Sequence, residues 1–195
     1  MEKREITRDD IMPMEIYTQE RKERRRALTE RKRDRRVSVG PDVTFYFENY
    51  DTMWHQIHEM LYIEKGDQDQ IKDELMAYNP LIPKGSELVA TMMFEIDDPD
   101  RRGRDLARLG GVEDTISIRI NGEIIPAVSE TEVERTTDQG KTSSIHFLHF
   151  PFTAKQIKNF RDESMEVILS ISHSNYGHMA LISGASRAAL TVDFD

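Results

Sequence analysis

The chain contains no cysteine, so its six histidines are the side chains best suited to metal binding or acid–base catalysis. The absence of cysteine excludes disulfides, thiolate nucleophiles and thiolate-bound zinc or iron–sulfur clusters within this chain. Any metal here needs histidine, carboxylate or water ligands. Four of the histidines form two pairs with a spacing of three residues, His55 with His58 and His146 with His149.

The first pair lies in a segment with helical periodicity. His55, His58 and Glu59 are three or four residues apart, so a helix can place them on one part of its surface, as a metal site requires. The spacing differs from HExxH, in which two histidines four residues apart flank a general base. His58 also follows Trp54 by four residues and borders the apolar face. A partly buried histidine with satisfied hydrogen bonds is the simpler interpretation.

The second pair lies in a predicted strand, where side chains alternate between the two faces. His146 and His149 are an odd number of residues apart, so they point to opposite faces and cannot share one metal in a regular strand. One of them could join a histidine from the C-terminal strand. A site of this kind, assembled across several elements, suits iron, manganese or zinc, and its candidate ligands are Glu48, His55, Glu59, His146 and His173.

No complete catalytic motif accompanies these residues. The sequence has no Gly-rich phosphate-binding motif of the G-x-G-x-x-G or G-x-x-x-x-G-K-[ST] type and no G-x-S-x-G nucleophile elbow. Nucleotide chemistry and α/β-hydrolase chemistry are therefore disfavoured. A binding protein and a metal-dependent enzyme both stay open.

Charge is distributed unevenly along the chain, whose net charge is -9. Residues 1–20 carry -3, residues 21–36 carry +7, and residues 37–195 carry -13. The middle segment consists of good helix formers without Gly or Pro, which predicts a basic helix. Its arginines could dock on an acidic protein or on phosphate, and the candidates are Arg24, Arg25, Arg26, Arg31, Arg33 and Arg35. A solvated helix lying across the acidic body is the alternative.

The apolar residues of this basic segment are Ala27 and Leu28. We therefore expect it to bury almost nothing and to be held by charge, which salt would screen. No aromatic residue is interleaved with its cations, so base stacking is not offered and only phosphate attraction remains. Nucleic-acid binding through this segment would be weak.

The composition fits one α+β domain with an appendage. The chain has 195 residues, of which 37% are hydrophobic. We divide it into a helical segment with the basic arm, residues 1–36, and a single domain, residues 37–195. Strands are predicted at 37–39, 43–47, 87–96, 115–120, 123–125, 143–150 and 165–173. Helices are predicted at 51–65, 67–78, 99–109 and 184–191, and a further short helix begins at Thr153.

Turn and capping residues support these elements. Asn121-Gly122 predicts a type I′ hairpin turn, Asp98 before Pro99 predicts a helix start, and Thr153 with Gln156 forms a capping box. Asp51 or Thr52 can cap the helix of the first histidine pair. Residues 129–142 are predicted as a loop and residues 172–178 as a turn.

The strands and helices alternate without a regular βαβ period. This pattern predicts an α+β fold with an antiparallel or mixed sheet and interspersed short helices, preceded by the basic N-terminal helix. No stretch approaches the ~18 apolar residues that a membrane span needs, and the first ten residues show no signal-peptide pattern. We expect a cytoplasmic protein that does not enter the membrane.

Several segments together resemble an uncharacterised bacterial family that is known as a domain of unknown function. The resemblance covers nearly the whole chain and is carried by residues 35–61, 77–96, 143–150 and 171–178. Distinctive phrases are Phe47-Glu48-Asn49 before the histidine helix and Asn79-Pro80-Leu81-Ile82-Pro83 before the Glu87 strand. Members are often encoded beside rubrerythrin-type diiron proteins and iron–sulfur oxidoreductases. The resemblance implies an accessory role near redox or metal chemistry and supplies no catalytic residues.

These observations favour an accessory or binding protein that works with an acidic or redox protein partner. The alternative is a His/carboxylate enzyme that uses a divalent transition metal. A second alternative is weak nucleic-acid binding through the basic arm.

Overall fold

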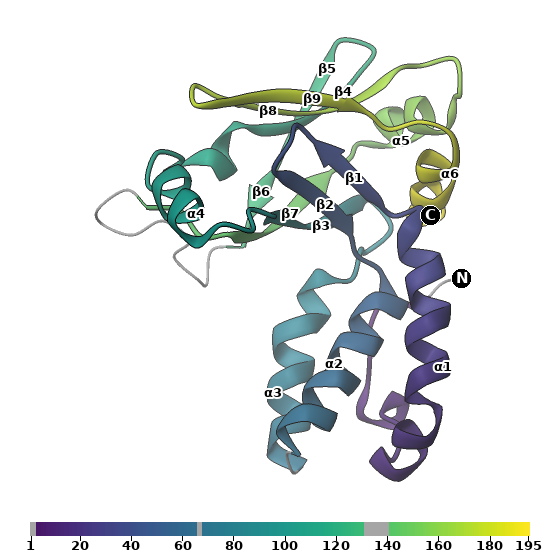
Figure 1. Ribbon diagram of the computed structural model, residues 1–195. Helices are drawn as coiled ribbons and strands as arrows, with labels where there is room; N and C mark the ends of the chain where they lie inside the picture. Colours follow the sequence, from purple (N-terminus) through teal and green to yellow (C-terminus); the bar gives the residue numbers. More distant parts are fainter. Residues whose placement is uncertain (1–2, 66–67, 131–140) are drawn as a thin grey trace.

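Two antiparallel sheets and a protruding group of helices make up the fold (Figure 1). The computed structural model describes residues 3–65, 68–130 and 141–195. One sheet has the strand order β1-β2-β3-β7-β6, with bounds Arg36–Val39, Val43–Phe47, Glu87–Phe94, Ile145–Pro151 and Val128–Ser129. The other has the order β5-β4-β8-β9, with bounds Glu123–Pro126, Ile116–Ile120, Val167–His173 and Tyr176–Leu181. The predicted α+β class is confirmed, and all strand pairs within the described residues are antiparallel.

The helices fall into two groups. Three long ones extend away from the sheets: α1 (Met14–Arg33), α2 (Tyr50–Glu64) and α3 (Gln68–Tyr78) (Figure 1). Shorter helices flank the sheets: α4 (Pro99–Leu106), α5 (Ala154–Arg161) and α6 (Gly184–Thr191). Single 3₁₀ turns occur at η1 (Arg8–Asp10), η2 (Asn79–Leu81) and η3 (Val112–Thr115). None of the helices in the described ranges is long and apolar enough to cross a membrane.

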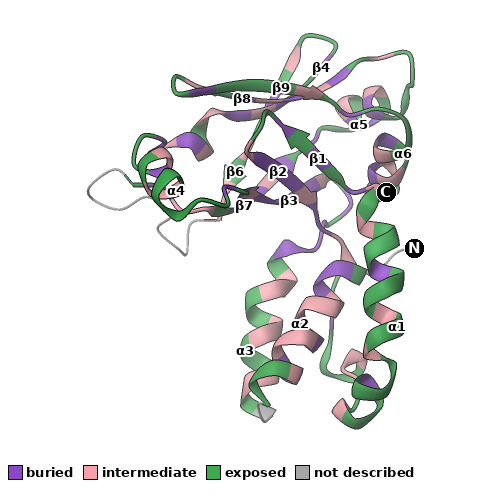
Figure 2. Ribbon diagram, viewed as in Figure 1, coloured by how far each residue is buried: buried purple, intermediate pink, exposed green. Residues whose placement is uncertain are grey.

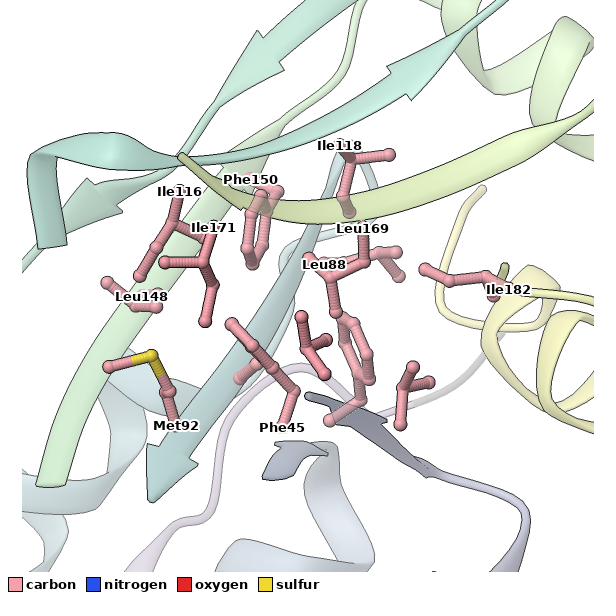
Figure 3. Packing of buried hydrophobic residues seen from close by; sticks show 14 of the residues in the cluster. Phe45, Leu88, Met92, Ile116, Ile118, Leu148, Phe150, Leu169, Ile171 and Ile182 are labelled. Carbon is pink, nitrogen blue, oxygen red and sulfur yellow. The ribbon is translucent and has the colours of Figure 1, made fainter. Parts of the chain in front are cut away.

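The main core lies between the two sheets (Figure 3). Alternate residues of the central strands face inward, for example Phe45 on β2, Leu88 on β3 and Leu169 on β8, which are all fully buried. Burying a side chain of this size contributes about 1.5–3 kcal/mol. The period-two pattern of the sequence is therefore the cause of the sheet packing.

A second, smaller core joins the five-stranded sheet to the long helices (Figure 2). Met53, Ile57 and Leu61 of α2 pack there with Val89, which lies on the outer face of β3. Strand β3 is consequently buried on both faces. This explains why its sequence is a nearly continuous apolar run.

Helix α1 packs more closely than its charge pattern predicts. The helix begins at Met14, and Tyr17 in its first turns is fully buried. Within the basic segment, Leu28 is also buried, and Arg35 just after the helix is only 5% exposed. The expectation that residues 21–36 bury almost nothing therefore fails at these two positions. Leu28 lies on the side of α1 that packs against α2, whereas Arg35 is enclosed by β2, the residue after it, and the residues in and after α6.

Strand β9 corrects the prediction of a turn at residues 172–178. Only residues 174 and 175 form the turn, and Tyr176 begins a strand that pairs with β8. The Tyr176 hydroxyl donates to the Val39 carbonyl at 2.8 Å and accepts from the Asp42 amide at 3.1 Å. These bonds hold the β1–β2 turn of the opposite sheet. Gly40 in that turn has φ +74°, and an added Cβ would lie 2.6 Å from the Tyr176 hydroxyl.

The other turn and cap predictions have mixed outcomes. The Asn121-Gly122 turn, the Asp98 cap and the Thr153 capping box are confirmed. Helix α2 is capped by Asn49 instead of Asp51 or Thr52, because the Asn49 side chain accepts from the Thr52 amide at 3.0 Å. Most of the predicted loop at 129–142 lies outside the described residues.

The second histidine pair confirms the strand-alternation argument. His146 points into the interior of the protein and is fully buried, whereas His149 lies on the outer face of β7. The Nδ1 and Nε2 atoms of His149 each lie 2.9 Å from a carboxylate oxygen, of Glu87 and Glu130 respectively. Only a doubly protonated ring donates to both. These hydrogen bonds raise the pKa of His149.

This arrangement predicts a pH-dependent contribution to stability. Because the pKa of His149 is higher in the folded protein than its unfolded value of about 6.5, the protonated ring contributes its full stabilisation below pH 6.5. This contribution is lost as pH rises through the folded-state pKa. In urea unfolding at pH 6, the variant His149→Gln should be about 1 kcal/mol less stable than the wild type. The difference should shrink at pH 9. A difference independent of pH would contradict the charged state assigned to His149.

Candidate functional site

The cations of α1 divide into paired and unpaired groups. Several of the proposed docking arginines have carboxylate partners: Arg24 pairs with Glu20, Arg31 with Asp51, and Arg33 with Glu30 and Asp34. In contrast, no ion pair is formed within the described residues by Lys22, Arg25 or Arg26. We call these three residues the cationic face.

The cationic face occupies neighbouring turns of one side of α1. Its members are exposed, and they line a shallow depression with Thr18, Thr29 and Tyr62. Arg21 also lines this depression, and its guanidinium lies 4.4 Å from the centre of the Tyr62 ring. Tyr62 comes from α2, so the depression is formed where the two helices meet.

A polar cluster between α1 and α2 fixes the orientation of this face. Arg21 binds both oxygens of Glu59 at 2.8 Å, and the Tyr17 hydroxyl donates to Glu59 at 2.7 Å. His55 Nδ1 lies 3.2 Å from the same hydroxyl. The bonds from Arg21 lower the pKa of Glu59, and burial raises the pKa of Tyr17 and lowers that of His55. Glu59 is therefore an anionic anchor for α1.

His58 is a satisfied buried histidine, as the simpler interpretation predicts. Its Nε2 accepts from the Met12 amide at 3.0 Å, and its Nδ1 lies 2.6 Å from the Trp54 carbonyl. The ring stacks on Trp54 with centroids 3.7 Å apart. Burial lowers the pKa of His58 to about 4, so the neutral ring holds the segment before α1 against α2.

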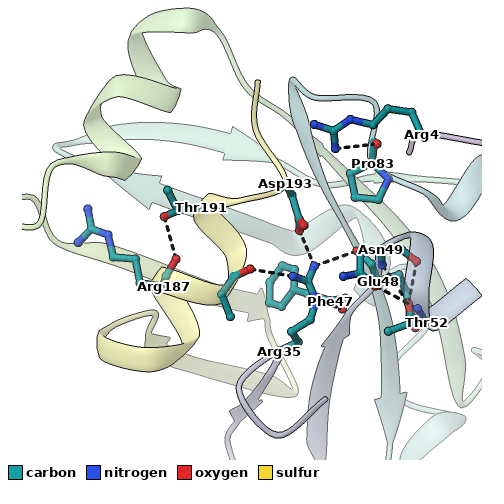
Figure 4. A network of polar contacts seen from close by, with 11 residues as sticks. Arg4, Arg35, Phe47, Glu48, Asn49, Thr52, Pro83, Arg187, Thr191 and Asp193 are labelled. Atoms are coloured by element: carbon teal, nitrogen blue, oxygen red, sulfur yellow. Dashed lines mark hydrogen bonds and ion pairs between the residues drawn. The ribbon is translucent and has the colours of Figure 1, made fainter. Parts of the chain in front are cut away.

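Arg35 departs from the proposed docking set because it is buried. Its guanidinium donates to the carbonyls of Phe47, Glu48 and Ala189 and pairs with Asp193 (Figure 4). These partners come from β2, from the residue after it, and from α6 and the residues after α6. Arg35 thus joins distant parts of the chain and is not exposed to a partner.

The five proposed metal ligands occupy four separate places. His55 and Glu59 lie together in the α1–α2 cluster. Glu48 is buried after β2, where it accepts from Thr91 at 2.7 Å. His146 lies in the main core, with Nε2 3.1 Å from the Thr142 hydroxyl. His173 ends β8, where its Nδ1 accepts from the Asn175 amide. Among the described residues, no group of three or more His, Asp or Glu is placed to hold a metal ion.

Sequence reasoning overlooked Lys22 and Tyr62 in this site. The helical spacing of Lys22, Arg25 and Arg26 was available as a signal, because residues three and four apart share a helix face. The spacing of four residues between Glu20 and Arg24 was a second signal, because it favours the salt bridge that removes Arg24 from the candidates. The contribution of Tyr62 depends on how α1 and α2 pack, which no local pattern specifies.

The fold and site define an α+β protein with two antiparallel sheets and a helical projection that bears a cationic face. The family described as "Protein of unknown function (DUF3501)" matches residues 5–194, and the chain belongs to this family. A similar solved structure is a novel protein of unknown function from Burkholderia pseudomallei K96243. It is 35% identical, with a TM-score of 0.90, and the match covers 97% of this chain and 99% of that chain. The comparison with curated proteins gave no match.

The buried position of Arg35 leads to a stability prediction. Removing one partner of a buried ion pair leaves the other charge uncompensated, which costs about 3–5 kcal/mol. Urea unfolding should show a loss of this size for Arg35→Met. The adjacent Arg36 is exposed on the first residue of β1, and Arg36→Met is the matched control with little expected change. Equal stability of the two variants would contradict a structural role for Arg35.

Proposed function

We propose that this protein is an accessory protein that binds an acidic partner protein through the cationic face. One observation carries the proposal: Lys22, Arg25 and Arg26 are exposed together without a carboxylate partner in the described residues, while neighbouring cations of α1 are paired. Keeping three like charges close together costs free energy. A partner with a complementary acidic surface offsets this repulsion.

The charge of the chain favours a protein partner over a nucleic acid. Residues 37–195 carry -13, which repels a polyphosphate that extends beyond α1. The aromatic ring beside the cationic face, Tyr62, already has the Arg21 guanidinium against it. A base stacked on that ring would have to displace Arg21 from Glu59. An acidic protein can bind the cationic face without displacing Arg21 from Glu59.

The class of partner follows from the family resemblance. That resemblance implies work beside diiron or iron–sulfur proteins, so we propose a redox or metal protein with an acidic surface as the partner. The charge argument applies to any acidic surface, whereas the redox setting rests on the resemblance alone.

Charge reversal of the cationic face tests the proposal. The variant K22E/R25E/R26E is compared with R104E/R119E/K158E, which makes the same charge change at exposed cations of α4, β4 and α5. Wild type and control should capture the same acidic proteins from a lysate of the native cells, and the cationic-face variant should lose them. With a purified partner, the association rate should fall on the order of ten-fold at low salt and less at high salt.

Two results would contradict the proposal. In one, the cationic-face variant captures the same proteins as the wild type at an equal rate. In the other, wild type binds a short DNA duplex or single strand more tightly than any captured protein, and the cationic-face variant alone loses that binding. Thermal melts of both variants verify that each remains folded.

A further inference from the structure

A cavity lies between the five-stranded sheet and the long helices, beside the second core and away from the cationic face. Its volume is ≈ 340 Å³, within the range of small-molecule sites. Apolar side chains from both sides line it, among them Met53 of α2, Leu81 of η2 and Phe147 of β7. The wall of the cavity between the helices and the outer face of the sheet is therefore largely apolar.

Glu48 is the anionic group in the wall of this cavity. The residue is 5% exposed, and its Oε1 accepts from the Thr91 hydroxyl at 2.7 Å. Its Oε2 is buried and has no hydrogen-bond partner in the part of the chain that the structure describes. The backbone around Glu48 is fixed, because its amide donates to Val89 and its carbonyl accepts from Arg35 (Figure 4).

A buried carboxylate oxygen without a partner is costly. An unsatisfied buried polar group typically costs 1–3 kcal/mol, and more when it is charged. A fold can avoid this cost by using an apolar residue or an amide at the position. A bound N–H donor removes the cost, and a cationic donor also compensates the charge.

We propose that this cavity binds a small organic molecule with a protonated amine and an apolar body, and that Glu48 holds the amine. The amine donates to Oε2, while the body contacts Met53, Leu81 and Phe147. Gln56 also lines the cavity, and its amide lies 3.4 Å from the Tyr78 hydroxyl, which supplies further polar contacts at the wall. The proposal is independent of the cationic face.

Lys32 narrows the class of ligand. Its side chain lines the same cavity from the end of α1, and within the described residues it forms no ion pair with Glu48. The cavity therefore presents a positive and a negative group that do not neutralise each other directly. A ligand that carries a carboxylate as well as the amine matches both. An apolar amino acid should then bind more tightly than the corresponding simple amine.

Three probes with the same branched apolar body test this site: isoamylamine, leucine and isocaproate. They differ in carrying an amine, both groups, or a carboxylate alone. Saturation-transfer NMR with the full-length protein should detect isoamylamine and leucine, with leucine the tighter of the two, and should detect isocaproate weakly or not at all. A raised thermal midpoint should accompany binding.

Two variants assign the binding to the cavity. Glu48→Gln keeps the shape of the side chain and should weaken both amine probes at least ten-fold, whereas the exposed control Glu166→Gln should leave them unchanged. Ile145→Trp enlarges a partly exposed side chain of the wall and should block the probes while keeping Glu48. If Glu48→Gln fails to fold, Ile145→Trp decides the question.

Three results would overturn the proposal. One is the absence of isoamylamine and leucine binding at millimolar concentration. Another is equal binding of the amines by wild type and Ile145→Trp. A third is isocaproate binding as tightly as leucine, which would show that Lys32 and not Glu48 selects the ligand. Without probes, Glu48→Gln should melt no lower than Glu166→Gln, because it removes an uncompensated buried charge; a large drop would assign Glu48 to the fold.

Discussion

The buried guanidinium of Arg35 is the constraint on which the arrangement of the chain depends. It lies two residues after α1 and binds carbonyls beside β2 and in α6, together with the carboxylate of Asp193. A buried cation is tolerated only when its donors are satisfied and its charge is compensated. The N-terminal helix, the first hairpin and the C-terminal residues must therefore meet at one point. Arg4 pairs with Asp195, the last residue, and its guanidinium also donates to the Pro83 carbonyl (Figure 4).

Strand β3 is the second structural centre, because it contributes to two cores. One face packs between the sheets, and the other supports the helices through Val89 and the cavity through Thr91. Glu48 stands at the edge of this arrangement, where its amide continues the pairing with β3. The polar group in the cavity wall is thus positioned by the same strand that builds the main core.

The sequence predicted the elements whose causes are local. The Asn121-Gly122 turn, the Thr153 capping box and the opposite faces of His146 and His149 each depend on neighbouring residues, and the structure confirms them. The proposed metal set depended instead on how distant elements meet. Glu59 bonds to Arg21 and Tyr17, and Glu48 lies in a different layer, which no periodicity reveals. Arg35 is predicted as a docking residue because it belongs to a cationic run. The pattern of that run does not indicate that Arg35 pairs with the buried carboxylate of Asp193, which lies 158 residues away in the sequence.

Buried anchors, more than surface charge, hold α1 in place on this account. Tyr17 and Leu28 are buried, and Glu59 and Arg35 fix the helix near its two ends, so the cationic face is presented on a rigid support. Hydrogen exchange of the α1 amides between low salt and 1 M salt tests this claim most directly, because the Debye length falls to about 3 Å at 1 M. We predict that α1 keeps its protection at high salt, like the sheets. Loss of protection in α1 alone would show that charge attraction, and not packing, holds the helix against the rest of the protein.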